Sequence, residues 1–144
     1  MDNPTNQSQN DFSGVWQSKY TFHSSSQDAE LVNYQYVRIL QEGDTIVVES
    51  IPEANESYII ARFNVDGRVV TGVWQDTALP DSYHKGVTYH GVGQLILSED
   101  GKSMTGKWLG HGKNLDVKVG PWEISWIAET ADGLGKAPGV QPLA

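Results

Sequence analysis

Bulky apolar and polar residues alternate along most of the chain, and this pattern predicts a protein built from β-strands. In the first such segment, residues 12–22, Phe12, Trp16, Tyr20 and Phe22 all occupy even positions. A period of two places these side chains on one face of a strand. No segment shows the three- to four-residue apolar repeat that is typical of an amphipathic helix. The pattern therefore predicts an all-β fold.

Short glycine-containing turns separate many of the predicted strands. Examples are Glu42-Gly43-Asp44, Asp66-Gly67 and Glu99-Asp100-Gly101, which are hairpin signals. A series of hairpins favours an antiparallel up-and-down barrel of eight to nine strands, because closure removes exposed sheet edges. An open sandwich is the alternative. The predicted strands are residues 12–22, 34–41, 45–51, 57–65, 68–76, 86–97, 102–109 and 121–128, with 116–119 either separate or part of the last strand, and with loops at 23–33 and 77–85.

The length of 144 residues indicates one domain. We expect the barrel to occupy residues 11–128. Residues 1–10 are polar and are expected to be disordered. Residues 129–144 contain glycine and proline without any periodicity, so disorder is expected there as well.

Charge and composition narrow the classes of partner. The net charge of −8 argues against nucleic acid and against anionic membrane surfaces, which both select clustered lysine and arginine. The chain has no cysteine, no apolar signal region and no run of membrane-spanning length. These features predict a soluble, cytoplasmic protein.

A [Ser/Thr]-Gly-x-Trp motif recurs in the predicted strands. Glycine and tryptophan two positions apart share a strand face, and a small residue beside an indole suits a strongly curved sheet. Two interpretations remain open: the indoles pack in a core, or some of them line a cavity. The copies are Ser13-Gly14-Val15-Trp16, Thr71-Gly72-Val73-Trp74 and Thr105-Gly106-Lys107-Trp108, with Gly120-Pro121-Trp122 as a looser one.

The Gly-x-Trp strands resemble those of calycin-type barrels, such as lipocalins and avidins. Residues 83–126 are more specifically similar to a domain that often follows a helix-turn-helix in bacterial, notably actinobacterial, regulators. The resemblance departs at His111, where an aromatic residue such as Phe is expected, and the sequence has no helix-turn-helix pattern. It therefore implies a calycin-like (lipocalin-like) barrel that senses or binds, and it does not imply DNA binding. The motifs that carry it are Tyr83-x-Lys85-Gly86-x-x-Tyr89-His90-Gly91, Gln94-Leu95, Met104-x-Gly106-x-Trp108, Gly112-Lys113-Asn114 and Gly120-x-Trp122-Glu123.

Two arginines occupy strand positions whose neighbours of the same parity are apolar or aromatic. Arg38 shares parity with Tyr36, and Arg62 shares parity with Ile60. If these faces point inward, the arginines and Glu49 would form a polar patch suited to a ligand carboxylate or phosphate. In the alternative, these faces point to solvent and the core contains the opposite set, which is Val37, Ile39, Ile59, Ala61 and Phe63.

The glycine-rich corner at residues 110–114 offers His111 and Lys113 as polar groups at a barrel mouth, although a plain solvated turn is equally consistent. The four histidines lack metal-ligand spacing, so we predict no metal site. No catalytic signature is present, and we predict no cofactor.

We therefore predict a barrel that holds a small apolar or aromatic ligand in its interior. One alternative is a small barrel enzyme, of cyclase or isomerase type, that acts by orienting its substrate. Another is a protein-interaction module, including a homodimer, that uses an exposed apolar face. The predicted wall residues are Trp16, Tyr36, Trp74, Tyr89, Trp108 and Trp122, and the predicted polar anchors are Arg38, Arg62, His111 and Lys113.

Overall fold

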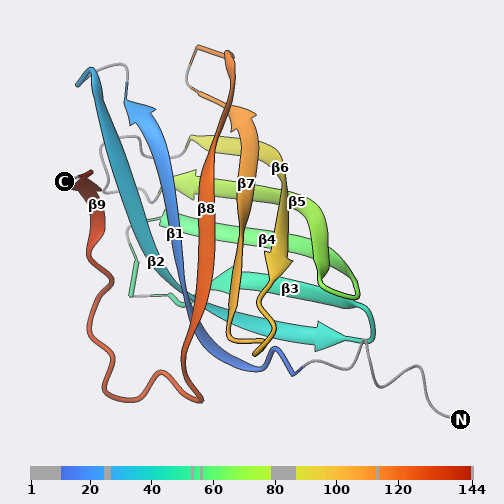
Figure 1. Ribbon diagram of the computed structural model, residues 1–144. Helices are drawn as coiled ribbons and strands as arrows, with labels where there is room; N and C mark the ends of the chain where they lie inside the picture. Colours follow the sequence, from blue (N-terminus) through green and yellow to red (C-terminus); the bar gives the residue numbers. More distant parts are fainter. Residues whose placement is uncertain are drawn as a thin grey trace, which may run out of the picture.

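The computed structural model describes residues 11–24, 27–52, 54–55, 57–78, 87–112 and 114–143, and their regular structure is entirely β-strand (Figure 1). This part of the chain has no helix with the length and apolar character needed to cross a bilayer. The strands are β1 (Gly14–Ser24), β2 (Ala29–Glu42), β3 (Thr45–Ser50), β4 (Ser57–Asp66), β5 (Val69–Ala78), β6 (Thr88–Leu97), β7 (Ser103–His111), β8 (Val117–Ala128) and β9 (Gly139–Pro142).

The first eight strands close into an antiparallel barrel. Each pairs with the next along the chain, and β1 pairs with both β2 and β8. Strand β9 pairs with residues 31–34 of β2, on the stretch of that strand's edge that β3 leaves free (Figure 1). The prediction of an eight- to nine-stranded antiparallel barrel is confirmed, and the open sandwich is wrong.

Two segments differ from the prediction, and a third settles an open alternative. Strand β2 begins at Ala29, within the polar stretch predicted as a loop, because residues 29–34 pair with β1. Of the two alternatives left open for residues 116–119, the continuous one holds, since Val117–Ala128 form one strand. The expected disorder of residues 129–144 does not hold for Gly139–Pro142, which form β9 through backbone pairing that composition does not reveal. The expected tail at 1–10 lies outside the described residues.

The two ends of the barrel differ in their connections. At one end, called the tight-turn end, short turns join β2 to β3, β4 to β5 and β6 to β7. At the other, called the long-loop end, residues 25–28, 51–56, 79–87 and 112–116 join the remaining neighbours.

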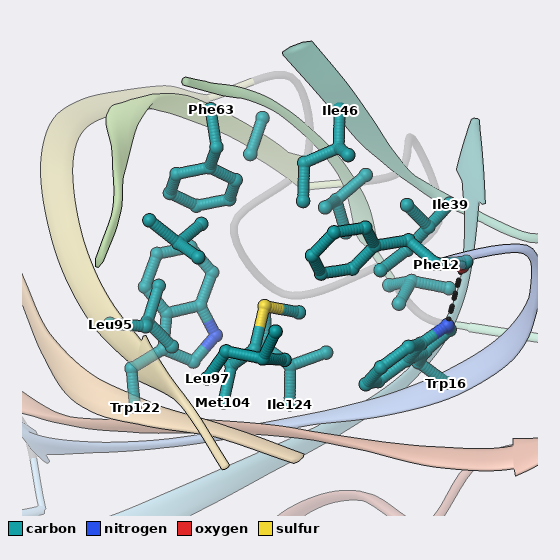
Figure 2. Packing of buried hydrophobic residues seen from close by; sticks show 14 of the residues in the cluster. Phe12, Trp16, Ile39, Ile46, Phe63, Leu95, Leu97, Met104, Trp122 and Ile124 are labelled. Atoms are coloured by element: carbon teal, nitrogen blue, oxygen red, sulfur yellow. Dashed lines mark hydrogen bonds between the residues drawn. The ribbon is translucent and has the colours of Figure 1, made fainter. Parts of the chain in front are cut away.

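Aromatic and aliphatic side chains fill the tight-turn end. Phe12 lies against Trp16, whose indole N–H donates to the Phe12 carbonyl oxygen at 2.9 Å (Figure 2). Trp122 packs on Phe63 with ring centroids 5.7 Å apart. Figure 2 shows the other large members of this core, which are Ile39, Ile46, Leu95, Leu97, Met104 and Ile124.

Candidate functional site

Polar side chains replace this apolar core on the inner face toward the long-loop end. Strand alternation places them there, since each lies two or four residues from a core side chain on the same strand. The cluster, called the polar layer below, comprises Tyr20 on β1, Asn33 and Gln35 on β2, Ser57 on β4 and Asp76 on β5.

A hydrogen bond between Tyr20 and Asp76 crosses the barrel interior. Strands β1 and β5 stand four strands apart in either direction around the ring, yet the Tyr20 hydroxyl donates to Oδ2 of Asp76 at 3.0 Å. The Asn33 amide donates to the Tyr20 oxygen at 3.0 Å, and the Gln35 amide donates to Ser57 at 2.5 Å. Five residues from four strands therefore meet in one layer.

Asp76 is the member of the polar layer whose charge is least well compensated. Its side chain is 8% exposed, and burial raises its pKa from the ordinary 3.8 to about 6, while hydrogen bonds from Tyr20, Ser57 and Gln35 partly oppose the shift. These contacts still leave Oδ1 without a hydrogen-bond partner of acceptable geometry among the described residues. A buried carboxylate with a vacant acceptor is costly.

Asp76 has two chemical capabilities. As an anion, it can accept hydrogen bonds from a ligand. With a pKa of about 6, it can also exchange a proton near neutral pH, which is the property of a general acid or base. Burial, followed by the charge on Asp76, raises the pKa of neighbouring Tyr89, so Tyr89 stays protonated.

Two indoles form an aromatic wall beside the polar layer. Trp74 and Trp108 meet edge to face with centroids 6.2 Å apart, and Tyr20 meets Trp108 in the same way at 6.3 Å. The Trp74 ring lies over two glycines of the neighbouring strands, since a Cβ at Gly110 would come within 2.5 Å of it and one at Gly91 would come closer still. A tryptophan of one strand therefore lies over the bare backbone of the next two.

The indole N–H groups in this wall are already satisfied by backbone carbonyl groups. Trp74 donates to Val92 at 3.0 Å. The pairing of β1 with β8 ends at Tyr20 and Trp122, beside Pro121, which has no N–H to continue the ladder. The Thr21 carbonyl instead accepts the Trp108 indole N–H at 3.0 Å. The rings are thus held in place and present π faces and edges, not free donors, to the interior.

Five of the six predicted aromatic wall residues face the interior, and they divide between its two ends. Trp74, Tyr89 and Trp108 lie on the inner face at the long-loop end and belong to the candidate site. Trp16 and Trp122 also face inward, but they are fully buried in the core at the tight-turn end. These two support the packing interpretation of their motif.

The proposed inward patch of Arg38, Arg62 and Glu49 does not form. The alternative register holds, since Val37, Ile39, Ile59, Ala61 and Phe63 fill the interior, and alternation then turns Tyr36, Arg38, Glu49 and Arg62 outward. Both arginines are exposed. On the outer face, Arg62 borders a shallow depression of about 240 Å³ that is also lined by Ile60, Val73, Trp74 and Gln75.

His111 lies at the rim of the long-loop end, not inside the barrel. Its Nε2 accepts the His90 backbone N–H at 3.2 Å, and its ring stacks on the His90 ring with centroids 5.9 Å apart. The Tyr89 ring also lies near it, tilted, with centroids 5.7 Å apart. Lys113 lies outside the described residues.

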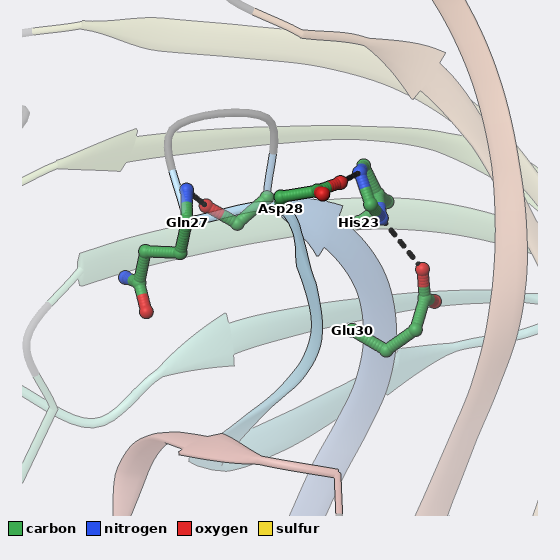
Figure 3. Close-up of polar contacts among 5 residues, drawn as sticks. His23, Gln27, Asp28 and Glu30 are labelled. Atoms are coloured by element: carbon green, nitrogen blue, oxygen red, sulfur yellow. Dashed lines mark hydrogen bonds and ion pairs between the residues drawn. The ribbon is translucent and has the colours of Figure 1, made fainter.

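A second polar cluster lies on the outside of the β1–β2 hairpin (Figure 3). His23 contacts Glu30 at 2.7 Å and Asp28 at 3.5 Å, and all three side chains are well exposed. Exposed pairs of this kind contribute little to stability. Among the residues whose positions are described, no group of three or more His, Cys, Asp or Glu could hold a metal ion.

The outer face carries a straight apolar row across four strands. Val73 on β5 pairs with Val92 on β6, which pairs with Leu109 on β7, which pairs with Val119 on β8. These four side chains are 44 to 61% exposed. We call this set the outer apolar row.

Sequence reasoning missed the polar layer, although the sequence contained a signal for it. Asp76 lies two residues after Trp74, Gln35 two before Val37, and Tyr20 four after Trp16. Each therefore shares the parity of a residue predicted to face inward. The sequence did not show that these positions converge at one level of the barrel.

Comparison of the chain with protein-family models and with curated proteins found no match.

Proposed function

We propose that this barrel binds a small, partly apolar or aromatic molecule at its long-loop end. The observation that carries the proposal is a buried carboxylate with a vacant acceptor, Asp76, set beside an aromatic wall. Binding sites commonly combine apolar and aromatic linings with a few polar groups. Perturbed titratable groups also concentrate at such sites.

Exposure at this end supports access from solvent. Tyr20, Trp74 and Tyr89 face the interior but remain partly exposed, whereas Trp16 at the other end is fully buried. The motifs that resemble the sensing domain of bacterial regulators include Tyr89 and Trp108, and they support the same function. We propose that the barrel is of the calycin-like (lipocalin-like) kind.

The five tryptophans make this proposal testable by nuclear magnetic resonance. A diverse set of small aromatic compounds is added to ¹⁵N-labelled protein, and the five indole N–H signals are followed. We expect bound compounds to shift the signals of Trp74 and Trp108. Trp16 and Trp126, at the tight-turn end, are internal controls and should stay unchanged.

Native mass spectrometry of protein isolated from its own host complements this experiment. An added mass that leaves on denaturation, together with shifts confined to Trp74 and Trp108, would support a bound ligand. If no compound moves these two signals and the isolated protein carries no added mass, binding in the barrel is refuted.

The outer apolar row supports a second candidate function, which is self-association of two copies of this chain. Its flanking outward positions carry Gln75 and His90 on one side and Gln94 and Lys107 on the other. None of these is a carboxylate, although the chain has a net charge of −8. Two such faces can therefore approach each other without acid–acid repulsion, and an identical row is a self-complementary partner.

Sedimentation equilibrium over a range of protein concentrations tests the dimer. We expect Leu109→Lys to shift the protein to monomer, because it places a charge in the middle of the row. Leu40→Lys is the matched control, since Leu40 is also exposed but lies on β2. A wild-type protein that stays monomeric at all concentrations would contradict self-association. If Leu109→Lys and Leu40→Lys change the dimer dissociation constant equally, the dimer interface lies on another face of the barrel.

A further inference from the structure

The polar layer lacks hydrogen-bond donors, not acceptors. Oδ1 of Asp76 and Oε1 of Gln35 are both buried without a partner among the described residues. Their side chains are 8% and 1% exposed, so bulk water hardly reaches them. An ionised carboxylate and an amide oxygen can only accept hydrogen bonds. A ligand that fills both vacant acceptors must therefore donate hydrogen bonds to two oxygens.

The layer also lacks positive charge. Within the described part of the chain, no lysine or arginine forms an ion pair with Asp76. Lys118 occupies an inward-facing position on β8, level with Gly110, but it makes no ion pair with this carboxylate. A negative charge in a water-poor place attracts a cation more strongly than it would in water.

The aromatic wall suits the same type of ligand. Because the Trp74 and Trp108 indole N–H groups already donate to backbone carbonyl groups, the rings offer only their π systems. Aromatic faces attract cations, and tryptophan does so most strongly. They also pack well against flat or apolar groups.

We propose that the ligand is a small organic cation with at least two N–H donors, such as a primary ammonium, amidinium or guanidinium group, on a flat or apolar body. Its N–H groups donate to Asp76 Oδ1 and Gln35 Oε1, and its body lies against Trp74 and Trp108. This inference rests on the proposed binding function and names the chemical class of the ligand.

Two other arrangements would also satisfy the vacant acceptors. A buried water molecule could bridge them. Alternatively, rotation of the Gln35 amide would exchange its oxygen and nitrogen, so that the nitrogen takes the vacant place of the oxygen. Neither arrangement requires a cationic ligand, and the experiment below separates them from the proposal.

Four probes isolate the contributions of charge and of N–H donors. Benzamidine and phenethylamine carry both, benzyltrimethylammonium has the charge without an N–H, and benzyl alcohol is neutral. Dissociation constants are measured by titration calorimetry, and the Trp74 and Trp108 indole signals report the place of binding. The protein variants are Asp76→Asn and Glu49→Gln. Glu49 is the matched control, because it is a carboxylate on the outer face that accepts the Tyr58 hydroxyl.

We expect benzamidine or phenethylamine to bind the wild type, and Asp76→Asn to weaken that binding about 30-fold, as is typical for a lost hydrogen bond to a charged group. Glu49→Gln should bind as the wild type does. Benzyltrimethylammonium and benzyl alcohol should each bind about 10-fold more weakly or worse, because neither supplies two donors and a charge.

The cation proposal would be overturned if benzyl alcohol bound as tightly as the N–H cations do and if Asp76→Asn did not change its affinity. That result would leave the proposal of ligand binding in the barrel intact. The proposal also fails if neither N–H cation binds while aromatic compounds from the diverse set still shift Trp74 and Trp108. If no compound of any class shifts these two signals, the proposed function fails together with it.

Discussion

Replacing Asp76 with Asn is expected to raise the free energy of unfolding by about 3 kcal/mol at pH 8 and to change it much less at pH 4. The pKa of Asp76 lies near 6 in the folded protein and near 3.8 in the unfolded chain. A difference of about 2 in pKa corresponds to about 3 kcal/mol. Asparagine is neutral at every pH and avoids this penalty.

The direction of the pH dependence follows from which state binds the proton. Below pH 3.8 both states are protonated at this position. Between pH 3.8 and about 6 the unfolded chain loses the proton first, so the wild-type protein loses stability as the pH rises. Above pH 6 the full cost of burying the charge is present. The gain from Asp76→Asn should therefore grow across this window and then level off.

Urea denaturation from pH 4 to pH 8 measures the effect. Asp100→Asn serves as a control of opposite sign, because hydrogen bonds from Ser98 and the Lys102 backbone lower the pKa of Asp100. The Asp100→Asn substitution should not raise the free energy of unfolding at pH 8. A variant Asp76→Asn that is no more stable than the wild type at pH 8 would show that the folded protein compensates the charge.

A stabilised Asp76→Asn variant would also bear on function. Asparagine has nearly the same shape, and its amide could donate to the vacant Gln35 oxygen. If the wild-type aspartate lowers the free energy of unfolding, then its negative charge or its proton has a role in function. The reason is that proteins keep destabilising residues mainly at functional sites. The stability measurement and the ligand titration thus test the same carboxylate independently.

The second large effect is expected for Gly106→Ala, which should lower the free energy of unfolding by roughly 3 kcal/mol or more. A Cβ at Gly106 would overlap the Gln94 carbonyl oxygen and come within 2.7 Å of the Leu95 Cα. Both atoms belong to the backbone of β6, which cannot rotate away as a side chain can. The β6–β7 ladder would have to separate, and the barrel depends on every ladder for closure.

Gly135→Ala is the matched control, because nothing lies within 4 Å of a Cβ at that position and its backbone is not left-handed. Its stability should be within about 0.5 kcal/mol of the wild type. Both variants are compared by urea denaturation at one pH. A Gly106→Ala protein within about 1 kcal/mol of the wild type would mean that β6 and β7 adjust to each other easily.

The glycine of the Gly-x-Trp motif thus has a clear physical basis. In the copies at Gly72 and Gly106, the missing Cβ lets the backbone of the preceding strand come close, with the Phe63 and Leu95 Cα atoms 2.7 Å from the virtual Cβ. The tryptophan two residues later then lies inside the ring. The motif could be recognised from the sequence because its glycine and tryptophan are two residues apart on one strand face.

Local patterning by itself determined most of the strands and turns, and it favoured the closed barrel over an open sandwich. Alternation of apolar side chains and hairpin turns depend on neighbouring residues only, so they are visible in one sequence. It also identified Trp74, Tyr89 and Trp108 as inward-facing aromatic residues.

Only the tertiary structure decided which charged residues lie inside and which polar residues meet. A one-residue change of register turns a whole strand over. The register that forms buries Val37, Ile39 and Phe63, and it also keeps the charges of Arg38 and Arg62 in water. Tyr20 and Asp76 are 56 residues apart in the chain. They meet because barrel closure sets β1 opposite β5, a relation that depends on all eight strands at once.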